Sequence, residues 1–218
     1  MTDANRAPVE ITALYDPLCG WCYGASSALR RLADQPRCSL GLLPTGLFAG
    51  PGARPLDEGF AAHAWANDQR IHALTGVPFS PAYRDRVLAD RRARLDSGPA
   101  IRALTAVAEN APGHELPALE AIQAARYRDG QDVTDPGVLA ALLQRLDLAL
   151  AADLMQRGDP ALDRAVAARI TAGRELLQSV GARGVPTLLL TTPAGVRVVP
   201  SELLYGPPDS LLTRLPLA

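Results

Sequence analysis

The sequence contains no lysine, since all 22 of its basic residues are arginine. A chain without lysine cannot form a Schiff base through a lysine amine, which excludes that form of covalent catalysis. The arginines are scattered and are balanced by 23 acidic residues, giving a formal net charge of −1. The chain therefore lacks the concentrated positive charge that nucleic-acid binding requires, and we expect no nucleic-acid partner.

Long apolar runs are also missing. No window approaches the ~18 consecutive apolar residues that a membrane-spanning helix needs. The first ten residues contain no apolar stretch of the kind found in secretory signals. We therefore expect a cytoplasmic protein without a membrane partner. Hydrophobic residues make up 48% of the 218 positions, which predicts one large globular domain or a smaller domain with an insertion.

Cysteine is scarce, with three residues in the chain, too few for a framework of structural disulfides. Cys19 and Cys22 are separated by two residues, a spacing typical of redox pairs and of zinc sites. Structural zinc requires four ligands, and no second pair is present, so the redox interpretation is favoured and no metal is expected. The other residues that could contribute ligands are Cys38, His63, His72 and His114.

The cysteine pair lies between a predicted strand and a predicted helix. Residues 9–15 form a short β-branched segment that ends at Asp16-Pro17, and residues 24–33 carry apolar side chains at helical spacing. Residues 38–43 resemble a second strand, which completes a strand–helix–strand unit. The helix of this unit begins at the cysteines.

The rest of the chain is mainly helical. After a Gly- and Pro-rich loop at 45–55, helices are predicted over 57–74, 81–95, 98–111, 115–129 and 136–146, with no strand among them. Asp159-Pro160 has the residues of a helix N-cap and first turn and begins a helix to about Val180. Strands at 187–192 and 196–199 form a predicted hairpin, followed by a helix at 209–215.

Two cysteines at positions i and i+3 of a helix start suit thiol–disulfide exchange. The first lies near unpaired backbone N–H groups, which stabilise a thiolate, and thiolate is the attacking species. Cys19 is therefore the expected nucleophile and Cys22 the expected resolving cysteine. Gly20 and Trp21 lie between them and influence the redox equilibrium of the pair.

A second motif, Gly184-Val185-Pro186-Thr187, lies directly before a predicted strand. Proline is tolerated at the first position of a strand, and a cis Val185–Pro186 bond is the alternative. The sequence pattern alone leaves both open.

Three segments carry a family resemblance. The segment Asp16-Pro-Leu-Cys-Gly-Trp-Cys-Tyr-Gly24, the Gly-Val-Pro-Thr segment and Ala125-Arg-Tyr-Arg-Asp-Gly-Gln-Asp-Val-Thr-Asp-Pro-Gly-Val-Leu139 resemble the DsbA-like family of the thioredoxin superfamily, including its FrnE-type and predicted protein-disulfide isomerase branches. The resemblance implies an α/β thioredoxin fold with an inserted all-helical domain. Residues 1–47 and 160–218 would form the thioredoxin-like domain, and residues 48–159 the insertion. It further implies that Pro186 is cis and that Val185 offers its backbone to a substrate.

The expected function is that of a protein-disulfide oxidoreductase or isomerase without a dissociable cofactor. Its expected partners are cysteine-containing proteins or small disulfides, together with a redox-recycling protein or glutathione, bound near Gly20, Trp21, Val185 and Pro186. The inserted fold also resembles kappa-class glutathione transferases and hydroxychromene carboxylate isomerases, which bind glutathione but generally have serine at the first motif position. A non-catalytic binding or holdase module is a further alternative.

Several other side chains have two alternative roles. Cys38 is expected to be a buried thiol rather than a third redox centre. His63 and His72 are assigned to solvent or packing roles, although histidine is suited to acid–base chemistry. Asp16 is either a proton acceptor or a turn former. Aromatic residues that could line a groove near the cysteines are Trp21, Tyr23, Phe48 and Trp65.

Overall fold

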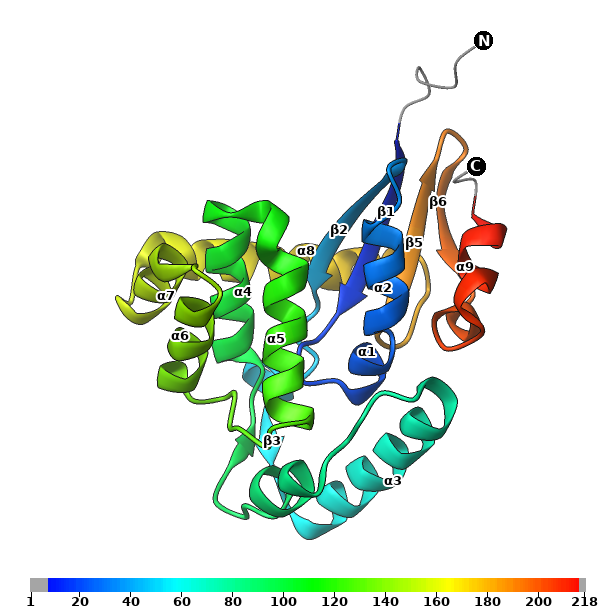
Figure 1. The fold of residues 1–218 in the computed structure, drawn as a ribbon. Coiled ribbons are helices and arrows are strands. Elements are labelled where there is room, and N and C mark those ends of the chain that lie inside the picture. The colour runs from blue at the N-terminus through cyan, green and yellow to red at the C-terminus, as the bar shows by residue number, and fades with distance from the viewer. Residues whose placement is uncertain (1–7, 216–218) are drawn as a thin grey trace.

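A four-stranded mixed sheet forms the centre of the fold in the computed structural model, which describes residues 8–215 (Figure 1). Its strands have the order β2-β1-β5-β6. They comprise β1 (Val9–Tyr15), β2 (Cys38–Pro44), β5 (Thr187–Thr192) and β6 (Gly195–Val199). The sheet therefore contains strands from near both ends of the described chain, where the sequence predicts them.

The first half of the sheet is a strand–helix–strand unit. β1 and β2 are parallel, with Val9 opposite Cys38 and Tyr15 opposite Pro44. The connection between them carries helices α1 (Gly20–Gly24) and α2 (Ser26–Ala33), so the single predicted helix is in fact divided at Ala25. β5 pairs antiparallel with β1, and β6 pairs antiparallel with β5. The predicted hairpin is confirmed.

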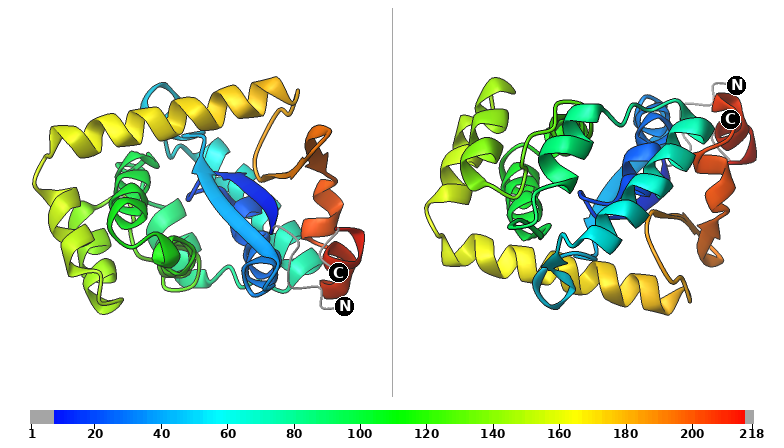
Figure 2. Two further views of the ribbon diagram at one scale, coloured as in Figure 1. Left: turned by 90° about the horizontal axis from the view of Figure 1, so that it is seen from above. Right: turned by 90° about the horizontal axis from the view of Figure 1, so that it is seen from below.

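Helices cover both faces of the sheet. α2 packs against the C-terminal helix α9 (Pro208–Arg214) on one side, while α8 (Pro160–Ser179) runs along the other side toward β5 (Figure 2). α8 approaches the end of β2 so closely that a Cβ on Gly173 would lie 2.4 Å from the carbonyl oxygen of Pro44. Glycine is therefore required at position 173 for this packing.

The middle of the chain is a block of helices beside the sheet. Its elements are α3 (Glu58–Thr75), the π-helix η2 (Tyr83–Leu88), α4 (Gly98–Asn110), α5 (Glu115–Tyr127), α6 (Pro136–Arg145) and α7 (Ala149–Gln156), with short 3-10 turns η1 (Gly50–Gly52) and η3 (Pro112–His114); a further turn, η4 (Ser201–Leu204), follows β6. The predicted N-cap Asp159 is confirmed, since its side chain accepts a hydrogen bond from the N–H of Ala161. Asp57 and Asp135 cap α3 and α6 in the same way.

Two expectations for this block were wrong. The predicted helix 81–95 ends at Leu88, because the side chain of Asp90 accepts the N–H of Arg92 and forms a turn in place of helical hydrogen bonding. The chain then forms β4 (Arg94–Leu95), which pairs with β3 (Arg54–Pro55), although no strand was expected in this part of the chain. Helix α7 was not predicted and follows Asp147, whose φ of 60° ends the preceding turn.

The core extends across the sheet and the helical block. One buried cluster runs from the cysteine segment into α4, α5 and α6, and a second lies between the sheet, α2 and α9. The division into domains at 47/48 and 159/160 stays a prediction, and its outermost residues 1–7 and 216–218 lie outside the described residues. Among residues 8–215, no helix is both long enough and apolar enough to cross a membrane.

Candidate active site

Cys19 lies where the chain leaves the sheet and enters its first helix. β1 ends at Tyr15, and Cys19 is the N-cap of α1 with an extended backbone (φ −86°, ψ 119°). The N–H groups of a first helical turn have no partner within the helix, so they favour negative charge beside them. This placement matches the position expected of an attacking thiolate.

Asp16 fixes the loop between β1 and Cys19. Its buried carboxylate accepts hydrogen bonds from the N–H of Leu18 (2.9 Å), the N–H of Phe48 (3.1 Å) and the hydroxyl of Ser97 (2.7 Å). Burial raises the pKa of Asp16, and these donors oppose the rise. The contact with Leu18 is the one expected if Asp16 is a turn former. The contacts with Phe48 and Ser97 hold the loop against the helical block.

Cys22 lies one turn further along α1 and is buried, with 3% of its surface exposed. Burial raises the pKa of the Cys22 thiol well above its usual range, and a hydrogen bond with Cys19 together with the negative charge of a Cys19 thiolate raises it further. Cys22 is therefore the more protected of the two sulfurs. Both are free thiols in this structure.

The loop before β5 faces Cys19. The Val185–Pro186 peptide bond is cis, as the family resemblance implied. The Cys19 thiol donates a hydrogen bond to the carbonyl oxygen of Val185, with 3.6 Å between sulfur and oxygen. Two segments 166 residues apart in the sequence thus meet at the sulfur.

A cavity of about 390 Å³ opens beside Cys19. Gly20, Trp21 and Val185 line it together with Phe48. Pro186 does not line this cavity but borders a second hollow of about 500 Å³, which also contains Trp21 and Val185. Cys19, Gly20, Trp21 and Val185 therefore come together at one cavity, and Pro186 borders the neighbouring hollow.

Part of the wall of this cavity is built by four residues that no sequence motif identified as site residues. Asp68 comes from α3, Tyr83 from η2, and Arg126 and Tyr127 from α5. The hydroxyl of Tyr127 donates to the carbonyl oxygen of Leu18 (2.8 Å), directly before Cys19. The one signal in the sequence was the segment Ala125–Leu139 of the family resemblance, which contains Arg126 and Tyr127.

The other predicted aromatic residues have different placements. Tyr23 is buried and stacks on Tyr127, with ring centroids 4.8 Å apart, so it belongs to the core and not to a groove. Phe48 lines the cavity, whereas Trp65 is not among its lining residues and instead packs near Tyr83.

The histidines and the third cysteine make no hydrogen bond with Cys19 among the described residues. His63 and His72 are exposed on α3, and His63 is one of the residues that line the cavity. Cys38 is half-buried at the start of β2, opposite the start of β1, which places it about 20 Å along the strand from the end that leads to Cys19. Burial raises the pKa of Cys38.

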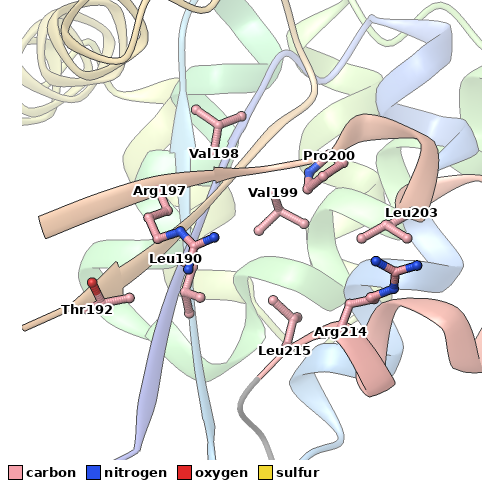
Figure 3. Close-up of a pocket in the computed structure, with 9 residues that line it drawn as sticks. All are labelled: Leu190, Thr192, Arg197, Val198, Val199, Pro200, Leu203, Arg214 and Leu215. Atoms are coloured by element: carbon pink, nitrogen blue, oxygen red, sulfur yellow. The ribbon is translucent and has the colours of Figure 1, made fainter. Parts of the chain in front are cut away.

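A further pocket lies between β5, β6 and α9 (Figure 3). Its volume is about 530 Å³, and the labelled side chains include Arg197 and Arg214 among apolar residues. Neither Cys19 nor Cys22 lines it. Within residues 8–215, no group of three or more His, Cys, Asp or Glu side chains is arranged to hold a metal ion.

Comparison with solved structures identifies near relatives of this fold. The cytosolic disulfide reductase DsbM from Pseudomonas aeruginosa is 32% identical, with a TM-score of 0.85 over 96% of this chain and 100% of that one. The structure of DsbM with GSH is 31% identical, with a TM-score of 0.79 over 94% of this chain and all of the other. A candidate protein disulfide isomerase from Nitrosomonas europaea shares the fold (TM-score 0.77, 22% identity, 94% and 95% coverage).

Sequence comparison leads to the same group. No curated protein matches the chain, but the family described as DSBA-like thioredoxin domain matches residues 10–202. That range spans the sheet except for Val9, together with the cysteine pair and the cis-proline loop. The expected α/β thioredoxin fold with added helices is thus confirmed, and the chain belongs to the DSBA-like thioredoxin domain family.

Proposed function

We propose that this protein is a cytoplasmic thiol–disulfide oxidoreductase that works in the reducing direction, with Cys19 as nucleophile and Cys22 as resolving cysteine. The observation that carries the proposal is the position of Cys19, whose thiol lies at the N-cap of α1, against the Val185 carbonyl and in the wall of a cavity. Cys22 lies behind it in the same helix and contacts it through a hydrogen bond.

In the first step the Cys19 thiolate attacks one sulfur of a substrate disulfide. A bond forms between Cys19 and that sulfur, the substrate disulfide bond breaks, and the other substrate sulfur leaves as a thiolate. Attack along the line of the disulfide requires an open approach to Cys19, which the cavity supplies. The backbone of Val185 is placed to hold the arriving chain beside the sulfur.

In the second step Cys22 attacks Cys19. The mixed disulfide breaks, the Cys19–Cys22 disulfide forms, and the substrate sulfur departs carrying the proton that Cys22 loses. Two of the effects that raise the pKa of Cys22 come from Cys19, namely its hydrogen bond and its charge. Both disappear once Cys19 is bonded to a substrate, so Cys22 becomes easier to deprotonate when it has to react.

Glutathione is the proposed reductant of the oxidised pair. Two glutathione thiols would then reduce Cys19–Cys22 in turn and leave as glutathione disulfide, which balances the two electrons passed to the substrate. The relative that is 31% identical to this chain has been solved with GSH, and the same relative is a cytosolic reductase. Its extensive similarity to this chain supports both the direction of exchange and the compartment.

Trapping of the mixed disulfide tests the proposal. The variant Cys22→Ser, incubated with glutathione disulfide, should gain the mass of one glutathione on Cys19, whereas Cys19→Ser should gain none. Wild-type protein should reduce insulin with glutathione present, and both variants should lose this activity. Cys38→Ser is the matched control, since this cysteine is also free but lies at the start of β2, opposite the start of β1, and it should behave like wild type.

The same variants distinguish the alternatives. A glutathione transferase needs no resolving cysteine, so conjugation of an electrophile would survive Cys22→Ser. A holdase would still suppress aggregation of an unfolded protein after Cys19→Ser. If insulin reduction survived Cys19→Ser, the proposed function would be wrong.

A further inference from the structure

Two oppositely charged side chains are buried in the wall of the cavity beside Cys19, and the exchange chemistry uses neither. Asp68 is 4% exposed and Arg126 is 2% exposed. Both line the cavity. Charged groups are rarely buried to this extent without a partner, because their removal from water is costly.

The partners of Arg126 are mainly aromatic, since it hydrogen-bonds to Tyr83 and Tyr127 and interacts with the charge of Asp68 without forming a direct ion pair in the described part of the chain. Its guanidinium lies 5.5 Å from the ring centroid of Tyr83 and 5.7 Å from that of Tyr127, which are cation–π contacts. Among residues 8–215 it forms no ion pair with a carboxylate, and its Nε has no hydrogen-bond partner. A planar guanidinium presents paired donors that match a carboxylate, so an incoming carboxylate would satisfy it.

Asp68 lies in the same wall, and Tyr83 contacts both Asp68 and Arg126. Its Oδ2 accepts a hydrogen bond from the hydroxyl of Tyr83 (3.1 Å). Its Oδ1 lies against the backbone next to Cys19, since a Cβ on Gly20 would be 2.4 Å from that oxygen. Burial raises the pKa of Asp68 to about 7, opposed by Tyr83 and by the charge of Arg126. A ligand ammonium group would stabilise the carboxylate in this position.

The size of the opening restricts what can reach the sulfur. Cys19 is only 7% exposed, and the adjoining cavity has a volume of about 390 Å³. Pockets of roughly 300–1,000 Å³ hold small molecules, and this one is near the lower limit. One arm of a short peptide disulfide is of a size that suits such a space.

We infer that the cavity is a binding site for a small zwitterionic thiol or disulfide of the glutathione type, with Arg126 receiving a carboxylate and Asp68 receiving an ammonium group. The inference rests on the proposed function, because the ligand is oriented for exchange with Cys19. It adds a specificity determinant that comes from the helical block and not from the cysteine or proline motifs. Asp68 and Arg126 are binding residues that leave the sulfur chemistry itself unchanged.

Rates of reaction with three disulfides test this inference. Glutathione disulfide carries both charges on each arm, dithiodipropionate carries only carboxylates, and bis(hydroxyethyl) disulfide is uncharged. Rates are measured by stopped-flow tryptophan fluorescence and divided by the rates of the same compounds with a small free thiol. Wild-type protein should favour glutathione disulfide over both other compounds after this correction.

Asp68→Asn is the decisive variant, because asparagine keeps the shape and can still accept from Tyr83. Hydrogen bonds to charged groups contribute about 1.5–3 kcal/mol, so the rate with glutathione disulfide should fall about 10-fold to 100-fold. The rate with bis(hydroxyethyl) disulfide should stay unchanged. Glu58→Gln is the matched control, since it removes the same charge from an exposed position of the same helix outside the cavity.

Arg126→Gln provides a second test and should reduce the rates with both carboxylate-bearing disulfides. If this variant does not fold, Asp68→Asn alone carries the test. If Asp68→Asn lowered the rates with all three disulfides equally, Asp68 would act on Cys19 or on the fold. If Asp68→Asn left the preference for glutathione disulfide unchanged, Asp68 would not bind the ligand. Either result overturns the inference. If no disulfide reacted with wild-type Cys19, the proposed function would fail instead.

Discussion

The buried carboxylate of Asp68 should make the protein less stable as pH rises, and Asp68→Asn should remove this loss. Burial raises the pKa of Asp68 from 3.8 to about 7 in the folded protein. Tyr83 and Arg126, the groups that face it from η2 and α5, oppose the rise without cancelling it. The unfolded chain therefore releases this proton at a lower pH than the folded protein does.

The size of the effect follows from proton linkage. Between pH 4 and pH 7 the folded protein holds a proton that the unfolded chain has lost, so the free energy of unfolding decreases through this window and levels off above it. A shift of about three pKa units corresponds to about 4 kcal/mol in full. Over the accessible range from pH 5 to pH 8, the loss should be about 2–3 kcal/mol.

Urea unfolding of wild type and Asp68→Asn across this pH range measures the difference. Asparagine does not titrate, so the gap between the two proteins should widen by about 2–3 kcal/mol from pH 5 to pH 8, with the variant more stable at the upper end. Contributions of other titrating groups are common to both proteins and cancel. If the free energy of unfolding changed with pH equally in both proteins, the conclusion that ionised Asp68 destabilises the fold through burial would be refuted. If Asp68→Asn were more stable than wild type at pH 8 but no longer preferred glutathione disulfide, the charge of Asp68 would serve function at a cost in stability.

Three further substitutions test contacts around the site by urea unfolding. Tyr127→Phe removes the donor to the buried carbonyl of Leu18 and should cost about 1–2 kcal/mol; no change would mean that this bond does not hold the cysteine loop. Arg169→Met leaves Glu115 buried without its 2.5 Å ion-pair partner and should cost about 3–5 kcal/mol, and a loss below about 1 kcal/mol would contradict this. Gly20→Ala places a Cβ 2.4 Å from a buried oxygen of Asp68, so it should cost about 1–3 kcal/mol and slow insulin reduction. An unchanged stability would contradict the tight contact between Gly20 and Asp68.

Local chemistry made the sheet and the cysteine segment predictable from sequence. β-branched and apolar runs bounded by Asp-Pro and Gly-Val-Pro defined β1 and β5, and Asp159-Pro160 defined the start of α8. Each of these signals lies within a few residues of the element that it predicts. The cysteine pair was equally local, since its placement at a helix start requires only the neighbouring residues.

The remaining errors come from interactions that are distant in sequence or depend on one side chain. The helix predicted over 81–95 has good helix-forming residues, but Asp90 bonds to the backbone and the chain pairs with Arg54 and Pro55 far upstream. The charged wall of the cavity could not be predicted for the same reason. Asp68 and Arg126 are 58 positions apart, and only tertiary packing places both beside Cys19.

Equilibration of the cysteine pair with glutathione redox buffers, followed by the fluorescence of Trp21, tests the central claim most directly. The account predicts a single two-electron transition, in which a tenfold change in the equilibrium constant corresponds to about 30 mV. The transition should persist in Cys38→Ser and vanish in Cys19→Ser. A signal that stays constant between fully reducing and fully oxidising buffers, or a transition that survives Cys19→Ser, would contradict the account.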